Sequence, residues 1–241
     1  MKRHLPNLLT CCNLFSGCIA AIMVFRNHLD FAAYFVFIAA FFDLLDGIVA
    51  RKVLSNPAFG KELDSLADVI SFGFVPGAVL FKLLQHSNMD FYFHSELFIR
   101  IFQFSPFIIT VFAALRLAKF NIDTRQSNSF IGLPTPANTL FIVSLPLILI
   151  QQSGQFDSII LNPYFIILVI LIFSFLMVSE IPLFSLKFKT FGFKENMFQY
   201  ILIAFALILF PMFLFAAVPV LIILYILLSV IQNNTKSKSL K

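Results

Sequence analysis

Long runs of apolar residues follow one another along the chain, separated by short polar segments. Each run approaches the roughly 20 residues that a membrane-spanning helix needs, and the pattern predicts eight helices. The weakest are a short helix that we expect Pro146 to break, and a final apolar stretch that we expect to turn back in a tight hairpin near Pro211 and Pro219. The runs lie at about 7–25, 31–51, 62–84, 97–119, 136–151, 163–180, 198–212 and 215–231.

Composition supports this all-α, polytopic membrane fold. The chain is 60% hydrophobic, has 34 Phe and a mean hydropathy of +0.94, far outside the usage of soluble domains. We therefore predict one transmembrane domain over residues 1–241. The net charge of +5 would suggest nucleic acid for a soluble chain, but here the basic residues lie between apolar runs. There they act as topology signals and contacts for anionic lipid, and no nucleic-acid partner is expected.

The basic residues also predict the orientation. Of the 17 Lys and Arg, all but Arg26, Lys82 and Arg100 fall on one side of an eight-helix arrangement. Because positive charge accumulates on the cytoplasmic side, both termini are expected there, in the cell membrane. Three cysteines share the first apolar run and are expected to be packing or lipid-facing thiols. They are Cys11, Cys12 and Cys18.

One acidic stretch interrupts the apolar pattern. Asp43, Asp46, Gly47 and Ala50 fall on one stripe of a helix, and a second helix carries another stripe that begins at Gly60. Ionisable groups at membrane depth are costly and indicate function. Converging carboxylates would repel one another without a cation, and all-oxygen ligands suit Mg²⁺ or Mn²⁺. The expected metal ligands are Asp43, Asp46, Asp64 and Asp68.

The same stretch resembles the signature of the CDP-alcohol phosphatidyltransferases. It reads Asp43-x-x-Asp46-Gly47-x-x-Ala50-Arg51, then Gly60-x-x-x-Asp64-x-x-x-Asp68, so the signature spans residues 43–68. The resemblance implies that fold, a divalent metal, CDP-diacylglycerol as donor and Asp68 as the base that takes the proton of the acceptor hydroxyl. Small residues interleaved with acids favour a pocket floor for the nucleotide.

Other residues are expected to complete the donor site. A start of Pro-Asn-x-x-Thr on the first helix is similar to lipid-synthesising members of the family, although helix capping would also explain Asn7 and Thr10. Arg51 can bind phosphate, and it can also be a membrane anchor. The residues expected to bind CDP-diacylglycerol are Asn7, Thr10, Asp46, Gly47, Ala50, Arg51 and Gly60.

Three further motifs resemble the subfamily that uses serine as acceptor. They are Ser-Phe-Gly-x-x-Pro from Ser71, AALRLAKFN with Arg116 and Lys119, and GLPTPA from Gly132. By physics alone, the first indicates a kink, the second a pair of anchoring cations and the third a rigid loop. The resemblance implies that Arg116, Lys119 and Ser71 bind serine or phosphate. The family usually has arginine where this chain has Lys119, which keeps the charge but loses the bidentate fork.

The resemblance implies transfer of the phosphatidyl group from CDP-diacylglycerol to the hydroxyl of L-serine, giving phosphatidylserine and CMP. We also expect a homodimer. One alternative is a related transferase that uses glycerol phosphate, inositol phosphate or an amino alcohol. An ion-coupled transporter could also hold acids at membrane depth, but it predicts two related halves, and the sequence shows no obvious repeat.

Overall fold

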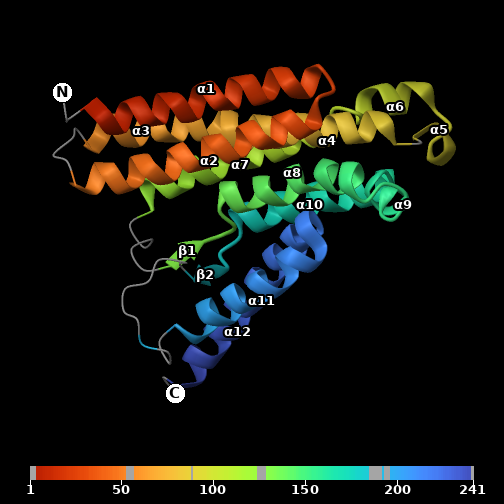
Figure 1. The fold of residues 1–241 in the computed structure, drawn as a ribbon. Coiled ribbons are helices and arrows are strands. Elements are labelled where there is room, and N and C mark those ends of the chain that lie inside the picture. The colour runs from red at the N-terminus through yellow and green to blue at the C-terminus, as the bar shows by residue number, and fades with distance from the viewer. Residues whose placement is uncertain are drawn as a thin grey trace.

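The computed structural model describes residues 4–52, 57–87, 89–123, 129–184, 192 and 196–239. Several of the expected basic positions lie outside these residues. They are Lys2, Arg3, Arg125, Lys187, Lys189, Lys194 and Lys241. The described chain is a bundle of helices with one short pair of strands (Figure 1), which confirms the predicted fold class.

The first two helices form an antiparallel pair. Helix α1 covers Leu5–Phe25 and α2 covers Leu29–Lys52, and they pack along their length. The chain reverses at Asn27, whose φ of 61° lies in the left-handed region that asparagine tolerates better than most residues. This turn brings the polar start of α1 alongside the acidic end of α2.

The second signature helix is part of one long element. Helix α3 (Pro57–Asp68) continues through a π-helical turn, η2 (Val69–Phe74), into α4 (Val75–His86). Pro76 has no N–H to bond to the carbonyl four residues earlier, which is that of Phe72. That carbonyl accepts a hydrogen bond from Thr139 Oγ1 at 2.8 Å. The kink expected in this run is therefore a π turn, a local irregularity that often lies at functional sites.

The next apolar run is not one helix. Short helices α5 (Met89–Tyr92) and α6 (Glu96–Phe102) precede a 3₁₀ turn, η3 (Ser105–Phe107), and then α7 (Ile108–Ile122). The single helix predicted at 97–119 is thus interrupted before Ile108. The reason is local: Pro106 lies in the 3₁₀ turn, because proline suits the first turn of a helix and disrupts its interior.

Helices α8 (Thr135–Gln151), α9 (Asp157–Ile160) and α10 (Pro163–Val178) follow. The predicted break at Pro146 is wrong, since α8 continues through it to Gln151. Pro146 removes one backbone hydrogen bond, but α8 is buried around it, and this packing stabilises the helix through the proline. Strands β1 (Ser129–Ile131) and β2 (Pro182–Phe184) pair antiparallel and connect the ends of α7 and α10.

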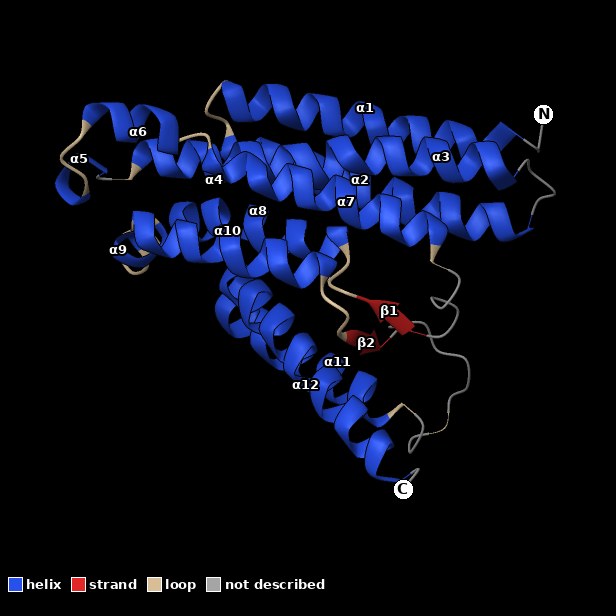
Figure 2. Ribbon diagram, turned by 180° about the vertical axis from the view of Figure 1, so that it is seen from behind, coloured by secondary structure: helices blue, strands red, loops and turns tan. Residues whose placement is uncertain are grey.

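The last apolar stretch is a helical hairpin, as predicted. Helix α11 (Met197–Phe213) ends in a 3₁₀ turn, η4 (Leu214–Ala216), and α12 (Ala217–Ser239) returns beside it. The reversal occurs at Leu214, with a φ of 48°, between the two prolines rather than at either. Figure 2 shows this hairpin leaning away from the other helices.

Within the described chain, five stretches are long and apolar enough to cross a membrane, and α8 and α10 are shorter apolar helices. The end of α2, the start of α3 and the end of α7 lie together near the N-terminus in Figure 1, and α4 ends at the opposite end of the bundle. Arg51, Lys61 and Lys119 therefore share one end, as the predicted topology requires.

Candidate active site

Two helices bring three carboxylates to one point. Asp43 projects from α2, and Asp64 and Asp68 project from α3, one helical turn apart. Each of these residues offers one carboxylate oxygen, and the three oxygens lie within 4.8 Å of one another. The stripes predicted from the sequence thus face each other. Asp46 is not part of this cluster, although it interacts electrostatically with Asp64.

Helix α1 holds the acids in place. Thr10 Oγ1 donates a hydrogen bond of 2.6 Å to Asp46 Oδ2, and Asn13 Nδ2 donates one of 3.1 Å to Asp68 Oδ1. All four side chains are buried, so these bonds are shielded from solvent. Asn13 was not among the predicted site residues. The signal was present, because Asn7, Thr10 and Asn13 recur at three-residue spacing on an apolar helix.

The cluster suits a divalent cation. Asp64 Oδ1 is buried and has no hydrogen-bond partner in the described part of the chain. An unpaired buried carboxylate oxygen is costly, and a hard cation among three carboxylates would satisfy it. The residues that could hold the cation are Asp43, Asp64 and Asp68, with Asp46 at the edge of the same space.

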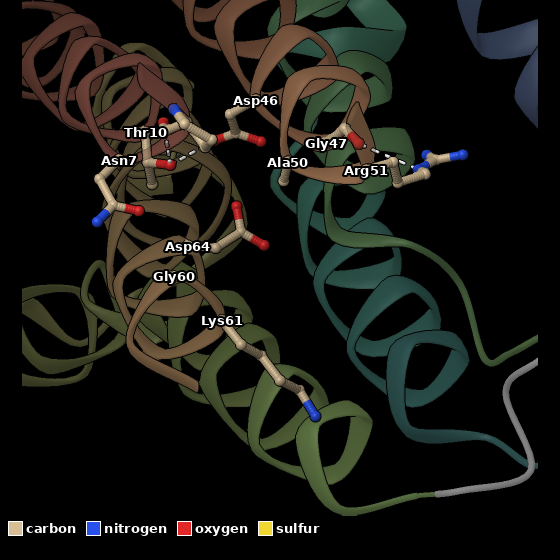
Figure 3. A pocket seen from close by; sticks show the side chains of 10 residues that line it. Asn7, Thr10, Asp46, Gly47, Ala50, Arg51, Gly60, Lys61 and Asp64 are labelled. Atoms are coloured by element: carbon tan, nitrogen blue, oxygen red, sulfur yellow. Dashed lines mark hydrogen bonds between the residues drawn. The ribbon is translucent and has the colours of Figure 1, made fainter. Parts of the chain in front are cut away.

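A cavity of about 330 Å³ opens beside the acids (Figure 3). An added Cβ at Gly47 would meet nothing within 4 Å, and one at Gly60 would meet only Asn7 Oδ1, at 3.5 Å. The two glycines therefore leave the floor of the cavity open. All seven residues predicted to bind the donor line it. The full lining is Pro6, Asn7, Thr10, Asp46, Gly47, Ala50, Arg51, Gly60, Lys61 and Asp64.

The two basic residues of this cavity have different surroundings. Arg51 donates from Nε to the carbonyl of Gly47 at 3.0 Å, and its guanidinium points away from Asp46 and Asp64 in Figure 3. Lys61 Nζ donates to the carbonyl of Asn121, so it ties α3 to the end of α7. From the sequence, Lys61 is expected only as a topology signal.

Arg116 is a buried cation near Asp68 that does not line the cavity. It is only 6% exposed, and its Nε has no hydrogen-bond partner among the described residues. Its guanidinium interacts electrostatically with Asp68 and with Tyr225 of α12, and its Cζ lies 5.4 Å from the centre of the Phe120 ring. A buried guanidinium with unused donor capacity beside a carboxylate cluster can bind a second anion.

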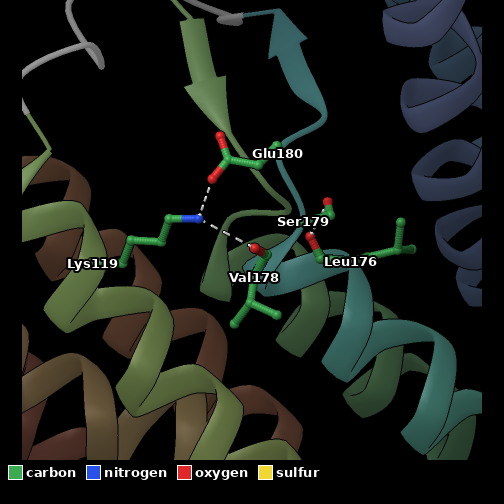
Figure 4. A network of polar contacts seen from close by, with 5 residues as sticks. All are labelled: Lys119, Leu176, Val178, Ser179 and Glu180. Carbon is green, nitrogen blue, oxygen red and sulfur yellow. Dashed lines mark hydrogen bonds and ion pairs between the residues drawn. The ribbon is translucent and has the colours of Figure 1, made fainter.

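Lys119 has other partners. Its Nζ pairs with Glu180 Oε1 at 2.5 Å and lies 3.4 Å from the carbonyl oxygen of Val178 (Figure 4). These contacts join α7 to the segment that follows α10. They favour Arg116 over Lys119 as the residue that contacts substrate.

Ser71, also predicted to bind substrate, is fully buried in the π turn. Its Oγ donates a hydrogen bond of 3.1 Å to the carbonyl of Asn13. Gly17 of α1 packs directly against it, since an added Cβ there would lie 2.3 Å from Ser71 Oγ. The structure therefore gives Ser71 a packing contact between α1 and η2, one turn from Asp68.

Fold and site together define an integral membrane protein with a cluster of carboxylates that could hold a metal ion beside a pocket at one end of the bundle. The chain belongs to the CDP-alcohol phosphatidyltransferase family, whose profile matches residues 3–178. The match includes every residue predicted for the site, and it excludes the α11–α12 hairpin.

Several curated relatives are similar over a shorter stretch. A CDP-diacylglycerol–serine O-phosphatidyltransferase of Helicobacter pylori is 35% identical over 140 residues, which are 57% of this chain and 55% of the relative. An archaetidylserine synthase of Methanothermobacter thermautotrophicus is 35% identical over 142 residues, 58% of this chain and 56% of the relative. A Bacillus subtilis CDP-diacylglycerol–serine O-phosphatidyltransferase is 30% identical over 142 residues, 59% of this chain and 75% of the relative. The chain thus spans little more than half the length of the first two.

Proposed function

We propose that this protein transfers the phosphatidyl group from CDP-diacylglycerol to the hydroxyl of L-serine, which produces phosphatidylserine and CMP. The observation that carries the proposal is the arrangement around Asp68. Asp68 belongs to the carboxylate cluster beside the cavity, and it also interacts with the buried cation of Arg116, which does not line that cavity. The names of the similar proteins support serine as the acceptor.

The donor fits the cavity by its chemistry. Its acyl chains would remain in the bilayer, while the nucleotide and pyrophosphate enter the cavity at the end of the bundle. Gly47 and Gly60 leave room for close approach, and Lys61 can move from the Asn121 carbonyl toward a phosphate. Arg51 lines the mouth of the cavity and can turn its guanidinium toward the same group.

Transfer requires one bond to form and one to break. The serine oxygen forms a bond to the phosphorus that carries diacylglycerol, the bridging P–O bond breaks, and CMP leaves with the bridging oxygen. A bound Mg²⁺ or Mn²⁺ would neutralise charge on the pyrophosphate. Its ligands would be Asp43, Asp64 and Asp68, with Asp46 close enough to complete the set on the side of the cavity.

Asp68 is the proposed base. Asn13 donates to its Oδ1, which fixes the carboxylate and leaves Oδ2 to accept the serine proton as the oxygen–phosphorus bond forms. Arg116 would hold the serine carboxylate, because it is buried, interacts with Asp68, and has an Nε without a partner among the described residues. The two residues would place the hydroxyl between the base and the phosphorus.

The location follows from the basic residues. Most of them, including Arg51, Lys61 and Lys119, fall on the side of the chain that carries the acids. By the positive-inside rule we propose that the site faces the cytoplasm from the cell membrane.

An acceptor panel tests the function. Purified protein would be incubated with CDP-diacylglycerol, Mn²⁺ and one acceptor at a time: serine, glycerol phosphate, inositol phosphate or ethanolamine. We expect CMP release and a new lipid with serine far above the other acceptors. Preferred use of another acceptor would assign the related transferase. No CMP release with any acceptor would refute transferase activity and leave an ion-coupled transporter to be tested.

A further inference from the structure

Two polar side chains at the start of α8 are completely buried without partners. Thr135 and Asn138 are both 0% exposed. Thr135 Oγ1 has no hydrogen-bond partner among the described residues, and neither does Nδ2 or Oδ1 of Asn138. A buried amide can make several hydrogen bonds, and a buried polar group that makes none is destabilising. Such a pair is a place where a polar ligand would restore the lost hydrogen bonds.

Neighbouring contacts show which way Asn138 faces. Thr139 bonds to the Phe72 carbonyl in η2, and the Phe141 ring lies 4.3 Å from that of Phe173 in α10. At about 100° per residue, Asn138 lies between these two directions on the helix, about 60° from Phe141 and about 100° from Thr139. Helices α7 and α4 both pack on η2 and α10, but α4 begins only at Val75, beyond the level of Phe72. At its own level, Asn138 therefore faces the side where α7 lies.

Thr135 and Asn138 lie at about the same level along the bundle as Asp68 and Arg116. Helix α7 is hydrogen-bonded to the α3–η2 element at two levels, through Thr110 to Gly73 and through Asn121 to Ser65. Arg116 lies between these two contacts along α7, at the level of Asp68. Helix α8 runs in the same direction as α3 and α4 (Figure 1) and is bonded to Phe72 at Thr139. One turn back along both helices, Thr135 is level with Asp68.

We propose that Asn138, assisted by Thr135, binds the α-ammonium group of the acceptor and so selects an amino acid. This inference rests on the proposed function and assigns a group that the proposed site leaves without a partner. Arg116 can bind only the carboxylate of serine, because a guanidinium accepts no hydrogen bond. The ammonium group needs oxygen acceptors, and Asn138 Oδ1 and Thr135 Oγ1 are buried oxygens with no hydrogen-bond partner in the described part of the chain.

The chemistry gives a sharp comparison between two ligands. Serine and 3-hydroxypropionate share a hydroxyl and a carboxylate, and they differ only in the ammonium group. If Asn138 binds that group, the variant Asn138→Leu, with a side chain of similar size, should bind serine more weakly. Its binding of 3-hydroxypropionate should not change. Hydrogen bonds to charged groups contribute about 1.5–3 kcal/mol. The expected rise in the serine KM is therefore roughly ten- to a hundredfold.

The test measures the serine KM and the inhibition constant of 3-hydroxypropionate against serine for the full-length protein and for Asn138→Leu. Both constants are independent of the fraction of enzyme that is active. Thr135→Val, which exchanges a hydroxyl for a methyl group, should change the two constants in the same pattern if the leucine variant yields no active protein. Ser144→Ala is the matched control, because Ser144 is equally buried in α8 and its Oγ already donates to the Phe141 carbonyl.

The outcomes separate this inference from the proposed function. A higher serine KM with an unchanged inhibition constant supports the assignment of Asn138. If the parent protein uses serine but the variants keep its KM, or if both constants rise by the same factor, Asn138 is a structural residue and the inference is wrong. If the parent protein does not use serine at all, the proposed function itself fails.

Discussion

Replacing Arg116 with alanine should weaken the binding of serine far more than the binding of CDP-diacylglycerol. Arg116 is buried, interacts with Asp68 and does not line the cavity that we assign to the donor. The substitution therefore removes the proposed contact with the serine carboxylate and leaves the donor contacts in place. Arg116→Lys keeps the charge but loses the planar fork, so its effect should be intermediate.

The magnitude follows from burial. At 6% exposure, the guanidinium is shielded from solvent, so the full value of a charged hydrogen bond applies, about 1.5–3 kcal/mol. This corresponds to a rise in the serine KM of roughly ten- to a hundredfold. The turnover number should also fall, because Asp68 loses the cation that interacts with it. The KM for CDP-diacylglycerol should change little.

The assay follows CMP release while each substrate is varied in turn, with ethanolamine as a second acceptor. Ethanolamine lacks the carboxylate, so it should be poor for the parent protein and gain relative to serine in Arg116→Ala. Arg100→Ala is the control, because Arg100 is exposed and pairs only with Glu96 in the described structure, at 3.6 Å. If Arg116→Ala keeps the parent's serine KM and its preference over ethanolamine, Arg116 is a membrane anchor, and Lys119 becomes the next candidate.

Three further predictions concern the metal, the topology and the packing. Chelating divalent cations should abolish CMP release, and adding Mn²⁺ or Mg²⁺ should restore it. Changing any one of the clustered aspartates to asparagine should lower the rate of CMP release at least about a hundredfold. Full activity in excess chelator would refute the dependence on a metal ion. In a background without native cysteines, a cysteine at position 56, in place of Asn56, should be labelled only from the cytoplasm and one replacing Gln155 only from the opposite side, whereas labelling from one face would overturn the eight-helix arrangement. Gly17→Ala should lower the melting temperature in detergent, with a loss of about 1–3 kcal/mol in the free energy of unfolding, because its methyl group would meet Ser71 Oγ at 2.3 Å. Gly47→Ala, with open space around the added methyl group, should not. Equal stability of the two variants would contradict the packing of α1 on η2.

The spacing of the acids was enough to predict the centre of the site. Asp64 and Asp68 are four residues apart and Asp43 lies on the facing helix, so helical periodicity alone places their carboxylates on opposing stripes. The cavity followed from the same periodicity together with the family resemblance. Local pattern also located the long helices, because each lies in a long apolar run, whereas the short helices α5 and α9 were not predicted.

Features that depend on distant partners were not predictable. Lys119 pairs with Glu180, 61 residues away, and no local pattern links them. Asn138 directly follows the GLPTPA motif, but its lack of partners depends on how α7, α8 and α10 meet. Pro146 was expected to break α8, since local propensity disfavours proline inside a helix, yet the packing of the helix overrides it.

The most direct test of the central claim follows the serine oxygen. Purified protein would be given CDP-diacylglycerol and serine labelled with ¹⁸O in its hydroxyl, and both products would be analysed by mass spectrometry. We predict phosphatidylserine that retains the label in its phosphodiester, together with an equal amount of unlabelled CMP. Label in CMP, or release of CMP without labelled lipid, would contradict transfer of the phosphatidyl group to the serine hydroxyl.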